Sequence, residues 1–435
     1  TETWREVVAR RQRCLDIREK LSKGEVHEIN DLVTLNLDIW QFARDAIVNA
    51  EGPELLRAFW HAIAGRMPEK SNEKIEPGIT ILDPTCGSGA FLFAALRILE
   101  TLYSDCLERM GRFLEDIADK PHHPKQFSDF KAVLDGISEH RGDRYFILKS
   151  IIINNLFGVD IMEEAVEICK LRLFLKLVAQ VESFDQIEPL PDIDFNIRAG
   201  NTLIGFSTRR ELQQIGEEDF IRRKEVGAIL EEAEDADSLY KRFQQIQTRG
   251  KEPPGAFKTK LQAKFSHLRE KCDAFLADIH KMGQSSKDEA LQEWKEKTKP
   301  FHWFVEFYGI MSAGGFDVII GNPPYLEFKE VNYAIKGFDT VETSAIHAVC
   351  IERGVRLLHS AGCMSMIVPL ALVSTQRMKT VQSILEAHGS VWYANFAWRP
   401  GKLFDTVNRA LTIFAVSRSG DRRTYTTGYQ KWTSD

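Results

Sequence analysis

Hydrophobic residues follow two different spacings along this chain. In the first 66 residues they recur at helical spacing, which predicts three helices at 3–21, 37–49 and 51–63. Pro53, near the start of the third segment, is typical of a helix N-terminus. A polar connection follows at 67–78, and the apolar runs after it are short, as strands are. The chain therefore opens with a helical region and continues as a different kind of fold.

Seven short apolar runs predict strands, and helical patterns separate most of them. One such helix is predicted at 345–362, with Gly362 as its cap. Strands that alternate with helices are typical of a parallel sheet wound on both faces. We predict an α/β fold with a doubly wound, mostly parallel, seven-stranded Rossmann-like sheet. Its strands are expected at 79–83, 155–160, before Gly200-Asn201, 316–321, 363–369, 390–398 and 410–418.

Residues 207–300 interrupt this alternation. They hold 19 Lys and Arg against 18 Asp and Glu, so the segment is dense in charge and nearly neutral. A heptad-like seam and a second apolar arm predict an antiparallel helical hairpin with a turn at 252–255. Both a solvated insertion and an arm that contacts substrate fit this pattern. The seam is Leu261, Phe265, Leu268, Cys272, Phe275 and Ile279, and the arm holds Phe220, Leu230, Leu239, Phe243 and Ile246.

Composition narrows the classes of protein. Seven scattered cysteines without a Cys-x-x-Cys pair argue against a disulfide framework and against a zinc site, and they fit a reduced cytoplasm. We expect no metal site. No apolar run reaches the roughly 18 residues of a membrane span, so no membrane partner is expected. The net charge of −6 means that a nucleic acid would have to meet a local basic surface.

The segment LDPTCGSGAF joins the first predicted strand to a helix. Gly87 and Gly89 leave room for a ligand near backbone N–H groups, but the spacing is neither the dinucleotide fingerprint nor a P-loop. Asp83, at the strand end, would repel a phosphate and would suit an ammonium group. Asp160, at the end of the second strand, has the position that binds ribose hydroxyls. Together they indicate S-adenosylmethionine.

A second unusual stretch is FDVIIGNPPYLE (316–327). The apolar run predicts a buried strand, but two prolines follow it, and proline cannot donate to a sheet ladder. The motifs DPTCGSGAF, FGVDI, AGNTLIGF and GNPPY stand in the order found in S-adenosylmethionine-dependent N6-adenine DNA methyltransferases. The chain most resembles the large type IIG-like enzymes of bacterial restriction-modification systems, over about residues 79–417.

The resemblance implies two sets of site residues. Asn322 and the Pro323 carbonyl would accept hydrogen bonds from the target N6, Pro324 would stiffen the turn, and Tyr325 would stack on the base. Phe404 resembles the second stacking aromatic, and an ordinary apolar loop residue fits it as well. Cys86 resembles a loop residue, not a nucleophile. The implied cofactor contacts are Asp83, Pro84, Thr85, Cys86, Gly87, Gly89, Phe91, Asp160, Ile161, Asn201 and Asn322.

The resemblance also implies an organisation. We expect a helical N-terminal region (1–78), a cofactor-binding half (79–206), the helical hairpin (207–300) and a catalytic half (301–435). Residues 1–78 lack the family's Phe/Tyr-Thr-Pro motif. We therefore expect the methyltransferase core of a longer bacterial, cytoplasmic protein, with nuclease or target-recognition domains elsewhere in the chain.

Double-stranded DNA is the expected partner. From 376 to 431, nine Lys and Arg stand against three Asp and Glu, an excess of six, among several aromatic residues. Arg399 and Arg409 lie closest in sequence to Phe404. This pattern favours phosphate binding, although a solvated basic surface has the same composition. Protein glutamine or RNA N6-adenine methylation, and a non-catalytic DNA-binding module, are the alternatives.

Overall fold

The computed structural model describes most of the chain from residue 39 onward. The described residues are 39–431 without 67–75, 118–126, 139, 141, 182–189, 219, 249–254, 280–286, 401, 405–406 and 419–421, together with 12, 15–16, 19–20 and 22–25. Most of the helix predicted at 3–21, and most of the turn predicted at 252–255, lie outside the described residues.

Helices precede the sheet, as predicted. They are α3 (Ile39–Val48) and α4 (Pro53–Ala64), and Pro53 is indeed at the start of α4. A short antiparallel pair, β1 (Gly65–Arg66) and β2 (Glu76–Pro77), leads into the sheet. Three further helices follow along the chain, between the first and second strands of the main sheet. They are α5 (Ala90–Ile117), α6 (Ser128–Ser138) and α7 (Asp143–Asn154).

The main sheet has the order β10-β8-β9-β7-β6-β3-β4-β5. Every pairing in it is parallel except those of β9, which runs antiparallel to both of its neighbours. The strands are β3 (Ile81–Asp83), β4 (Leu156–Asp160), β5 (Ile197–Ala199), β6 (Phe316–Gly321), β7 (Leu358–Pro369), β8 (Ser390–Phe396), β9 (Leu411–Ser417) and β10 (Thr424–Gln430). The predicted fold class is confirmed.

The sheet has eight strands instead of the seven expected. The additional strand is β10, which pairs with β8 at the edge. Its residues are almost all exposed, so it carries no hydrophobic alternation that a sequence pattern could reveal. A second difference concerns α15 (Ile346–Leu357), which ends before the predicted cap Gly362. Leu358 already pairs with Phe316 of β6, and a register shift absorbs the residues up to Cys363.

Both faces of the sheet are buried. Ile81 belongs to a core shared with α5 and α7, whereas the next residue, Leu82, belongs to a core shared with α15 and Trp303. Consecutive side chains of a strand point to opposite faces, so this split shows a three-layer arrangement. Helices α5 and α8 (Glu163–Val178) contact β3, β4 and β5, while α15 and α17 (Lys379–His388) contact β7, β8 and β9.

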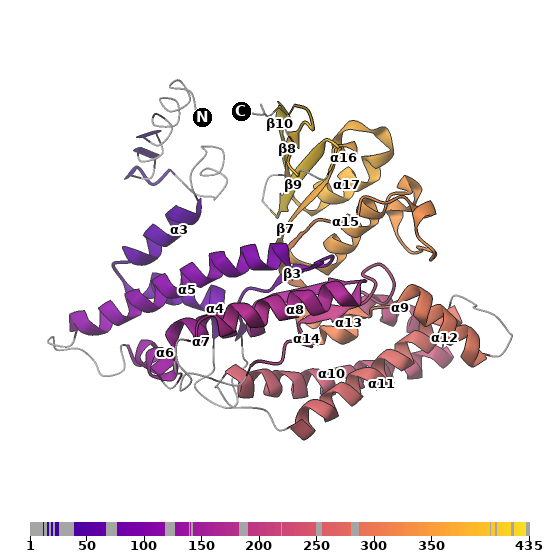
Figure 1. Cartoon of the computed structure of the whole chain (residues 1–435), viewed down its shortest axis with the longest axis horizontal. Helices are drawn as coiled ribbons and strands as arrows, with labels where there is room; N and C mark the ends of the chain where they lie inside the picture. The colour runs from indigo at the N-terminus through magenta and orange to yellow at the C-terminus, as the bar shows by residue number, and fades with distance from the viewer. Residues whose placement is uncertain are drawn as a thin grey trace.

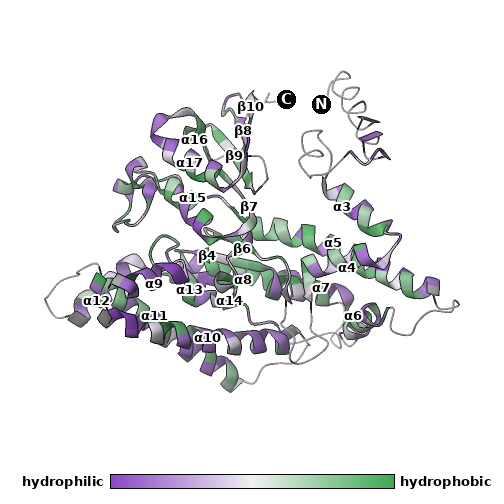
Figure 2. Ribbon diagram, turned by 180° about the vertical axis from the view of Figure 1, so that it is seen from behind, coloured by the Kyte–Doolittle hydropathy of each residue, from purple (hydrophilic) through white to green (hydrophobic). Residues whose placement is uncertain are grey.

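The segment from 207 to 300 is helical. It forms α9 (Arg209–Glu218), α10 (Phe220–Thr248), α11 (Gly255–Ile279) and α12 (Lys287–Thr298). Figures 1 and 2 both place α10 and α11 side by side, away from the strands β7 to β10. Figure 2 shows more hydrophilic residues on α9 to α12 than on α5 and α7. The predicted seam is confirmed on α11, where Leu261, Phe265, Leu268, Cys272 and Phe275 are buried.

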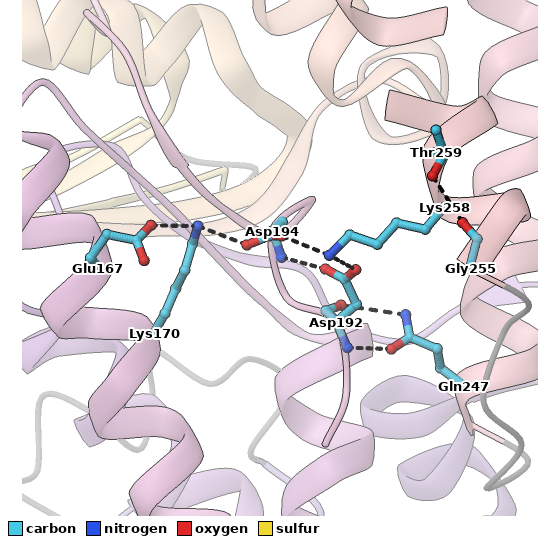
Figure 3. A network of polar contacts seen from close by, with 8 residues as sticks. All are labelled: Glu167, Lys170, Asp192, Asp194, Gln247, Gly255, Lys258 and Thr259. Carbon is cyan, nitrogen blue, oxygen red and sulfur yellow. Dashed lines mark hydrogen bonds and ion pairs between the residues drawn. The ribbon is translucent and has the colours of Figure 1, made fainter. Parts of the chain in front are cut away.

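Charged side chains bind this helical segment to the rest of the chain. Lys258 of α11 binds Asp192 and Asp194, and Asp194 also accepts a hydrogen bond from Lys170 of α8 at 2.9 Å (Figure 3). Although burial raises the pKa of Asp194, hydrogen bonds from Lys170 and Lys258 lower it below the usual value. Among the described residues, no helix is both long and apolar enough to cross a membrane.

Candidate active site

Four adjacent parallel strands bring the predicted site residues to one edge. Strand β3 pairs with β6 on one side and with β4 on the other, and β4 pairs with β5. Because parallel strands end at the same edge, Asp83, Asp160, Asn201 and Asn322 follow strand ends that lie in a row. The chain moves from β3 outward to β5 and then returns to β6 on the other side of β3. Ligands bind at such a switch point in doubly wound sheets.

Asp83 lies where the two motifs meet. Its side chain is 1% exposed, and its Oδ1 accepts the Thr85 N–H at 3.1 Å. Burial, followed by the charge of Asp160, raises the pKa of Asp83 to about 7. A Cβ at position 321 would lie 3.0 Å from Asp83 Oδ1, so Gly321 lets the start of Asn-Pro-Pro-Tyr approach the carboxyl group. A buried carboxylate without a cationic partner is costly, and an ammonium ligand would relieve that cost.

Two glycines and the Asp160 carboxylate set the conformation of the glycine loop (84–89). Gly87 has a φ of 50° and Gly89 a φ of 86°, conformations that favour glycine. A Cβ on Gly89 would also lie 2.5 Å from Cys169 Sγ. Asp160 Oδ2 accepts the Gly87 N–H at 2.8 Å, and Asp160 Oδ1 accepts the Met162 N–H at 2.9 Å. Asp160 thus positions the loop, and its remaining lone pairs can accept ribose hydroxyls.

Asn201 and Thr85 hold polar atoms without protein partners. Asn201 is 2% exposed; its Oδ1 accepts the Leu203 N–H at 3.0 Å, whereas its Nδ2 has no partner. Thr85 Oγ1 is likewise buried and unpaired. Buried polar atoms are normally hydrogen-bonded, so unpaired ones next to a glycine loop indicate ligand contacts. An amide donor suits the ring nitrogens of an adenine, and the set fits S-adenosylmethionine.

The other predicted cofactor residues differ in their burial and in their contacts. Pro84 is buried, and its carbonyl accepts the hydroxyl of Thr202, which links the loop to the segment after β5. Cys86 points inward: its Sγ lies 3.0 Å from where a Gly158 Cβ would be. Phe91 is half-buried in the first turn of α5, and Ile161 is 37% exposed. Sequence analysis missed Thr202, although it stands inside the quoted motif AGNTLIGF.

The Asn-Pro-Pro-Tyr segment continues directly from β6. Asn322 and Pro324 are exposed, whereas Pro323 is buried. The Tyr325 hydroxyl donates to the Ile367 carbonyl of β7 at 3.0 Å, and burial raises the pKa of Tyr325 above its usual value. Arg409 Nη1 donates to the Tyr325 carbonyl at 3.2 Å. The tyrosine side chain is therefore anchored at its hydroxyl and the backbone of the residue at its carbonyl, while Asn322 is exposed.

His347 is a neighbour of Tyr325 that sequence analysis missed. Its ring stands edge-on to the tyrosine ring, with centroids 6.4 Å apart and an interplanar angle of 86°. The imidazole is 4% exposed, and neither ring nitrogen has a partner. Burial, and then the charge of Arg377, lowers the pKa of His347 to about 4. A single histidine in an apolar helix pattern gives no sequence signal of such contacts.

The predicted second aromatic lies in the segment before β9. Phe404 is half-buried, and its carbonyl accepts the Val407 N–H at 3.1 Å. Among the described residues, no ring contact joins it to Tyr325, so its role stays a prediction. Arg399 stacks on the neighbouring Trp398 ring at 4.1 Å. Arg409 binds the Tyr325 carbonyl, so one of its guanidinium N–H groups is already paired within the protein.

Comparison with protein-family models identifies the chain. The model described as Eco57I restriction-modification methylase matches residues 154–397, more than half of the 435 residues. The chain belongs to the Eco57I restriction-modification methylase family. The model of the DNA-methyltransferase domain of MmeI matches residues 67–203. Together the two matches include β3, the glycine loop, β4 and β5, and the Asn-Pro-Pro-Tyr segment.

A curated relative from Methanocaldococcus jannaschii, described as a putative type II restriction enzyme and methyltransferase, is 29% identical over 392 residues. The match covers 79% of this chain and 29% of that relative, so the chain spans less than a third of the relative's length.

Two solved structures align with most of the chain at low identity. The match to the DrdV–DNA complex has a TM-score of 0.36 at 11% identity, and it covers 91% of this chain and 29% of the DrdV chain. The match to the type IIL restriction-modification enzyme MmeI in complex with DNA has a TM-score of 0.35 at 11% identity, and it covers 92% of this chain and 38% of the MmeI chain. Likenesses of this size carry no argument about function.

Proposed function

We propose that this chain methylates DNA, transferring the methyl group of S-adenosylmethionine to N6 of an adenine flipped out of the duplex. It would act as the modification part of a longer restriction-modification protein, with nuclease or target-recognition domains elsewhere. One observation carries the proposal: Gly321, directly before Asn-Pro-Pro-Tyr, lies so close to Asp83 and the glycine loop that a Cβ there would be 3.0 Å from Asp83 Oδ1 and 3.5 Å from Thr85 Oγ1. This proximity supports a cofactor site next to a site for the target base, as group transfer requires.

The cofactor half of the site would use residues from three strands. Asp83 would bind the ammonium group, Asp160 the ribose hydroxyls, and Asn201 the adenine ring. When bound, S-adenosylmethionine supplies an electrophilic methyl group on its sulfonium. Loss of water from this edge strengthens each of these contacts. In this scheme residues 79–206 are the cofactor half and 301–435 the catalytic half, with 1–78 and 207–300 as helical additions.

The catalytic half would prepare the nucleophile. The lone pair of adenine N6 is delocalised into the ring, and two acceptors on its two N–H groups favour the form whose lone pair is available. The Asn322 side-chain oxygen and the Pro323 carbonyl would be these acceptors. Proline has a restricted φ, so the carbonyl direction is set before the base arrives. After transfer the nitrogen is cationic and releases its proton to water, so no strong base is required.

The base must leave the duplex first, at a cost of a few kcal/mol. Tyr325 would offset much of this cost, because stacking on an aromatic ring contributes roughly 1–3 kcal/mol. Its hydroxyl bond to Ile367 anchors the ring beforehand, and the Arg409 contact holds the backbone carbonyl of the same residue. We propose Phe404 as the second stacking ring, and the basic residues of 376–431 as phosphate contacts.

A labelling experiment tests the function. The full chain is incubated with labelled S-adenosylmethionine and unmethylated duplex DNA, and the digested nucleosides are separated. We expect the label in N6-methyl-deoxyadenosine for the native chain and about 10²–10³-fold slower labelling for Asn322→Ala, which should still bind the cofactor. Label found only in protein glutamine or in RNA would overturn the assignment to DNA.

A further inference from the structure

A large cavity lies between the helical insertion and the catalytic half. Its volume is about 1120 Å³, which exceeds the usual size of a small-molecule site. One wall comes from the segment after β5 and from α9, another from α11 and α12, and a third from residues 332–337 and α15. No residue of the glycine loop, and none of Asp83, Asp160, Asn201 or Asn322, lines it. It is therefore a different site from the candidate active site.

Two buried polar side chains in its lining lack partners. Arg353 is 3% exposed, and its Nε and Nη1 atoms have no hydrogen-bond partner. Its Nη2 donates to the Leu203 carbonyl at 3.0 Å, which fixes the guanidinium in place. Ser207 is fully buried, and its hydroxyl also has no partner. Leaving such groups unpaired is costly, so a ligand that supplies acceptor oxygens would be favoured.

The charge around the cavity favours an anion. Arg210, Lys297 and Lys336 are exposed lining residues. Of the two acidic lining residues, Glu211 is held by the backbone N–H of Ser207 and lies 3.6 Å from Arg356. The remaining acid is Glu293, so cations outnumber acids in the lining. Arginine and hydroxyl donors at the bottom of such a cavity are the usual partners of phosphate oxygens.

Aromatic side chains also line the cavity. Phe206 and Trp294 are buried lining residues, and Tyr333 is half-buried. Phe206 already stacks on His302, with ring centroids 5.3 Å apart, whereas no ring contact among the described residues involves Trp294 or Tyr333. A purely inorganic anion would leave these two rings without a stacking partner. An aromatic ring attached to a phosphate would cover them, since rings stack favourably on aromatic side chains. A duplex backbone would not reach a guanidinium that is buried to this degree, so the ligand is a small molecule.

We propose that this cavity binds a free nucleoside phosphate, with its phosphate on Arg353 and Ser207 and its base against Trp294 and Tyr333. The site lies beside the cofactor half, because Arg353 binds the Leu203 carbonyl and Leu203 donates to Asn201. A bound ligand would order the segment that carries Asn201. The helical insertion thus gains a function beyond packing. The proposal stands whether or not the chain methylates adenine.

Calorimetric titration of the full chain with adenosine monophosphate tests the proposal. We expect saturable binding, and at least tenfold weaker binding of adenosine, because charge-assisted hydrogen bonds contribute about 1.5–3 kcal/mol. Arg210→Glu with Lys336→Glu should weaken binding at least tenfold, since both residues are exposed and their exchange leaves the fold intact. Lys224→Glu, an exposed residue of α10 outside the cavity, is the matched control and should leave binding unchanged.

Two competition measurements complete the test. S-adenosylhomocysteine should not displace adenosine monophosphate, because the two ligands occupy different sites. Displacement by it would assign the binding to the cofactor site and overturn the proposal. A short DNA duplex should not displace the nucleotide either; if it does, the phosphate site belongs to nucleic acid. Absence of saturable binding, or binding unaffected by the double substitution, also overturns the proposal.

Discussion

The carboxyl edge of the sheet and one buried charged cluster differ in how their polar groups are paired. We call this cluster the junction, and it consists of Arg198, Arg269, Asp273, His302 and Glu306. At the edge, Asp83 has only a backbone hydrogen bond, and Thr85 Oγ1 and Asn201 Nδ2 have no partner. At the junction, Glu306 is 3% exposed and pairs with both Arg198 and Arg269. The edge holds unused hydrogen-bonding capacity, and the junction uses its capacity within the protein.

The junction also satisfies its histidine. His302 is fully buried; its Nδ1 accepts the Phe206 N–H at 3.3 Å, so its Nε2 carries the hydrogen that bonds Asp273 at 3.0 Å. His347 at the edge is equally deep and has no such bonds. Burial of a polar side chain alone therefore does not indicate a ligand-binding site. A buried polar group without a partner does, because folding does not repay its desolvation.

The largest effect should follow from breaking the junction. Glu306→Ala leaves Arg198 and Arg269 without their shared carboxylate, and removing one member of a buried ion pair costs about 3–5 kcal/mol. Denaturant unfolding of the variant measures this loss. Glu296→Ala, at an exposed glutamate of α12, is the control and should change stability little. An unfolding free energy close to native in Glu306→Ala would mean that the junction contributes less than its geometry indicates.

At the edge, the expected loss is in activity and not in stability. Asn322→Ala should reduce methyl transfer about 10²–10³-fold, the usual consequence of removing one preorganised polar contact to a transition state. Its melting temperature should stay within error, because Asn322 is exposed. Single-turnover methylation and thermal unfolding of the same preparation separate the two. Near-native turnover in this variant would remove Asn322 from the proposed mechanism.

The buried carboxyl group of Asp83 should make the unliganded protein pH-sensitive. Its folded-state pKa of about 7 exceeds the ordinary value of 3.8, so the folded chain binds more protons between these values. Stability should fall as the pH rises from about 4 to 7 and then level off. Cofactor affinity should rise about tenfold per pH unit toward 7, because an ammonium group needs the carboxylate. In Asp83→Asn this dependence of the affinity should disappear; if it persists, another group is responsible.

A smaller effect is expected at His347. His347→Phe removes two unpaired ring nitrogens while it keeps an aromatic ring beside Tyr325. The variant should be more stable by about 1 kcal/mol, since buried unpaired polar atoms cost roughly that much or more. The folded-state pKa of about 4 lies below the ordinary 6.5, so the unfolded chain binds the additional proton between these values, and the gain should be smallest above pH 7 and grow as the pH falls toward 4. A loss of stability would show that the nitrogens are bonded in the folded protein.

The smallest effect should come from the network around Asp194. Lys258→Met removes an ion pair whose lysine side chain is 36% exposed, and such pairs contribute up to about 1 kcal/mol. The change should lower the unfolding free energy by less than 1 kcal/mol, far less than Glu306→Ala. A loss as large as that of Glu306→Ala would erase the distinction between exposed and buried pairs in the insertion.

The sequence by itself determined the sheet, the glycine loop and the position of Asn-Pro-Pro-Tyr. These features depend on local patterns: apolar strands, glycines with positive φ and prolines that end a strand. The family match agrees with the motifs that carried the resemblance. Strand β10 was not predicted, because its residues are mostly exposed and polar. The start of β7 was predicted as helix, because pairing with Phe316 overrides the helical pattern of its residues.

Only the tertiary structure decided which polar groups remain unpaired. Asp83 and Asp273 are both buried acids, but one has no charged partner among the described residues, while the other binds His302 and Lys295. These differences arise between residues far apart in the chain, such as Gly321 against Asp83 and Arg353 against Leu203. Sequence spacing does not encode such distances, because they follow from how the layers pack around the sheet.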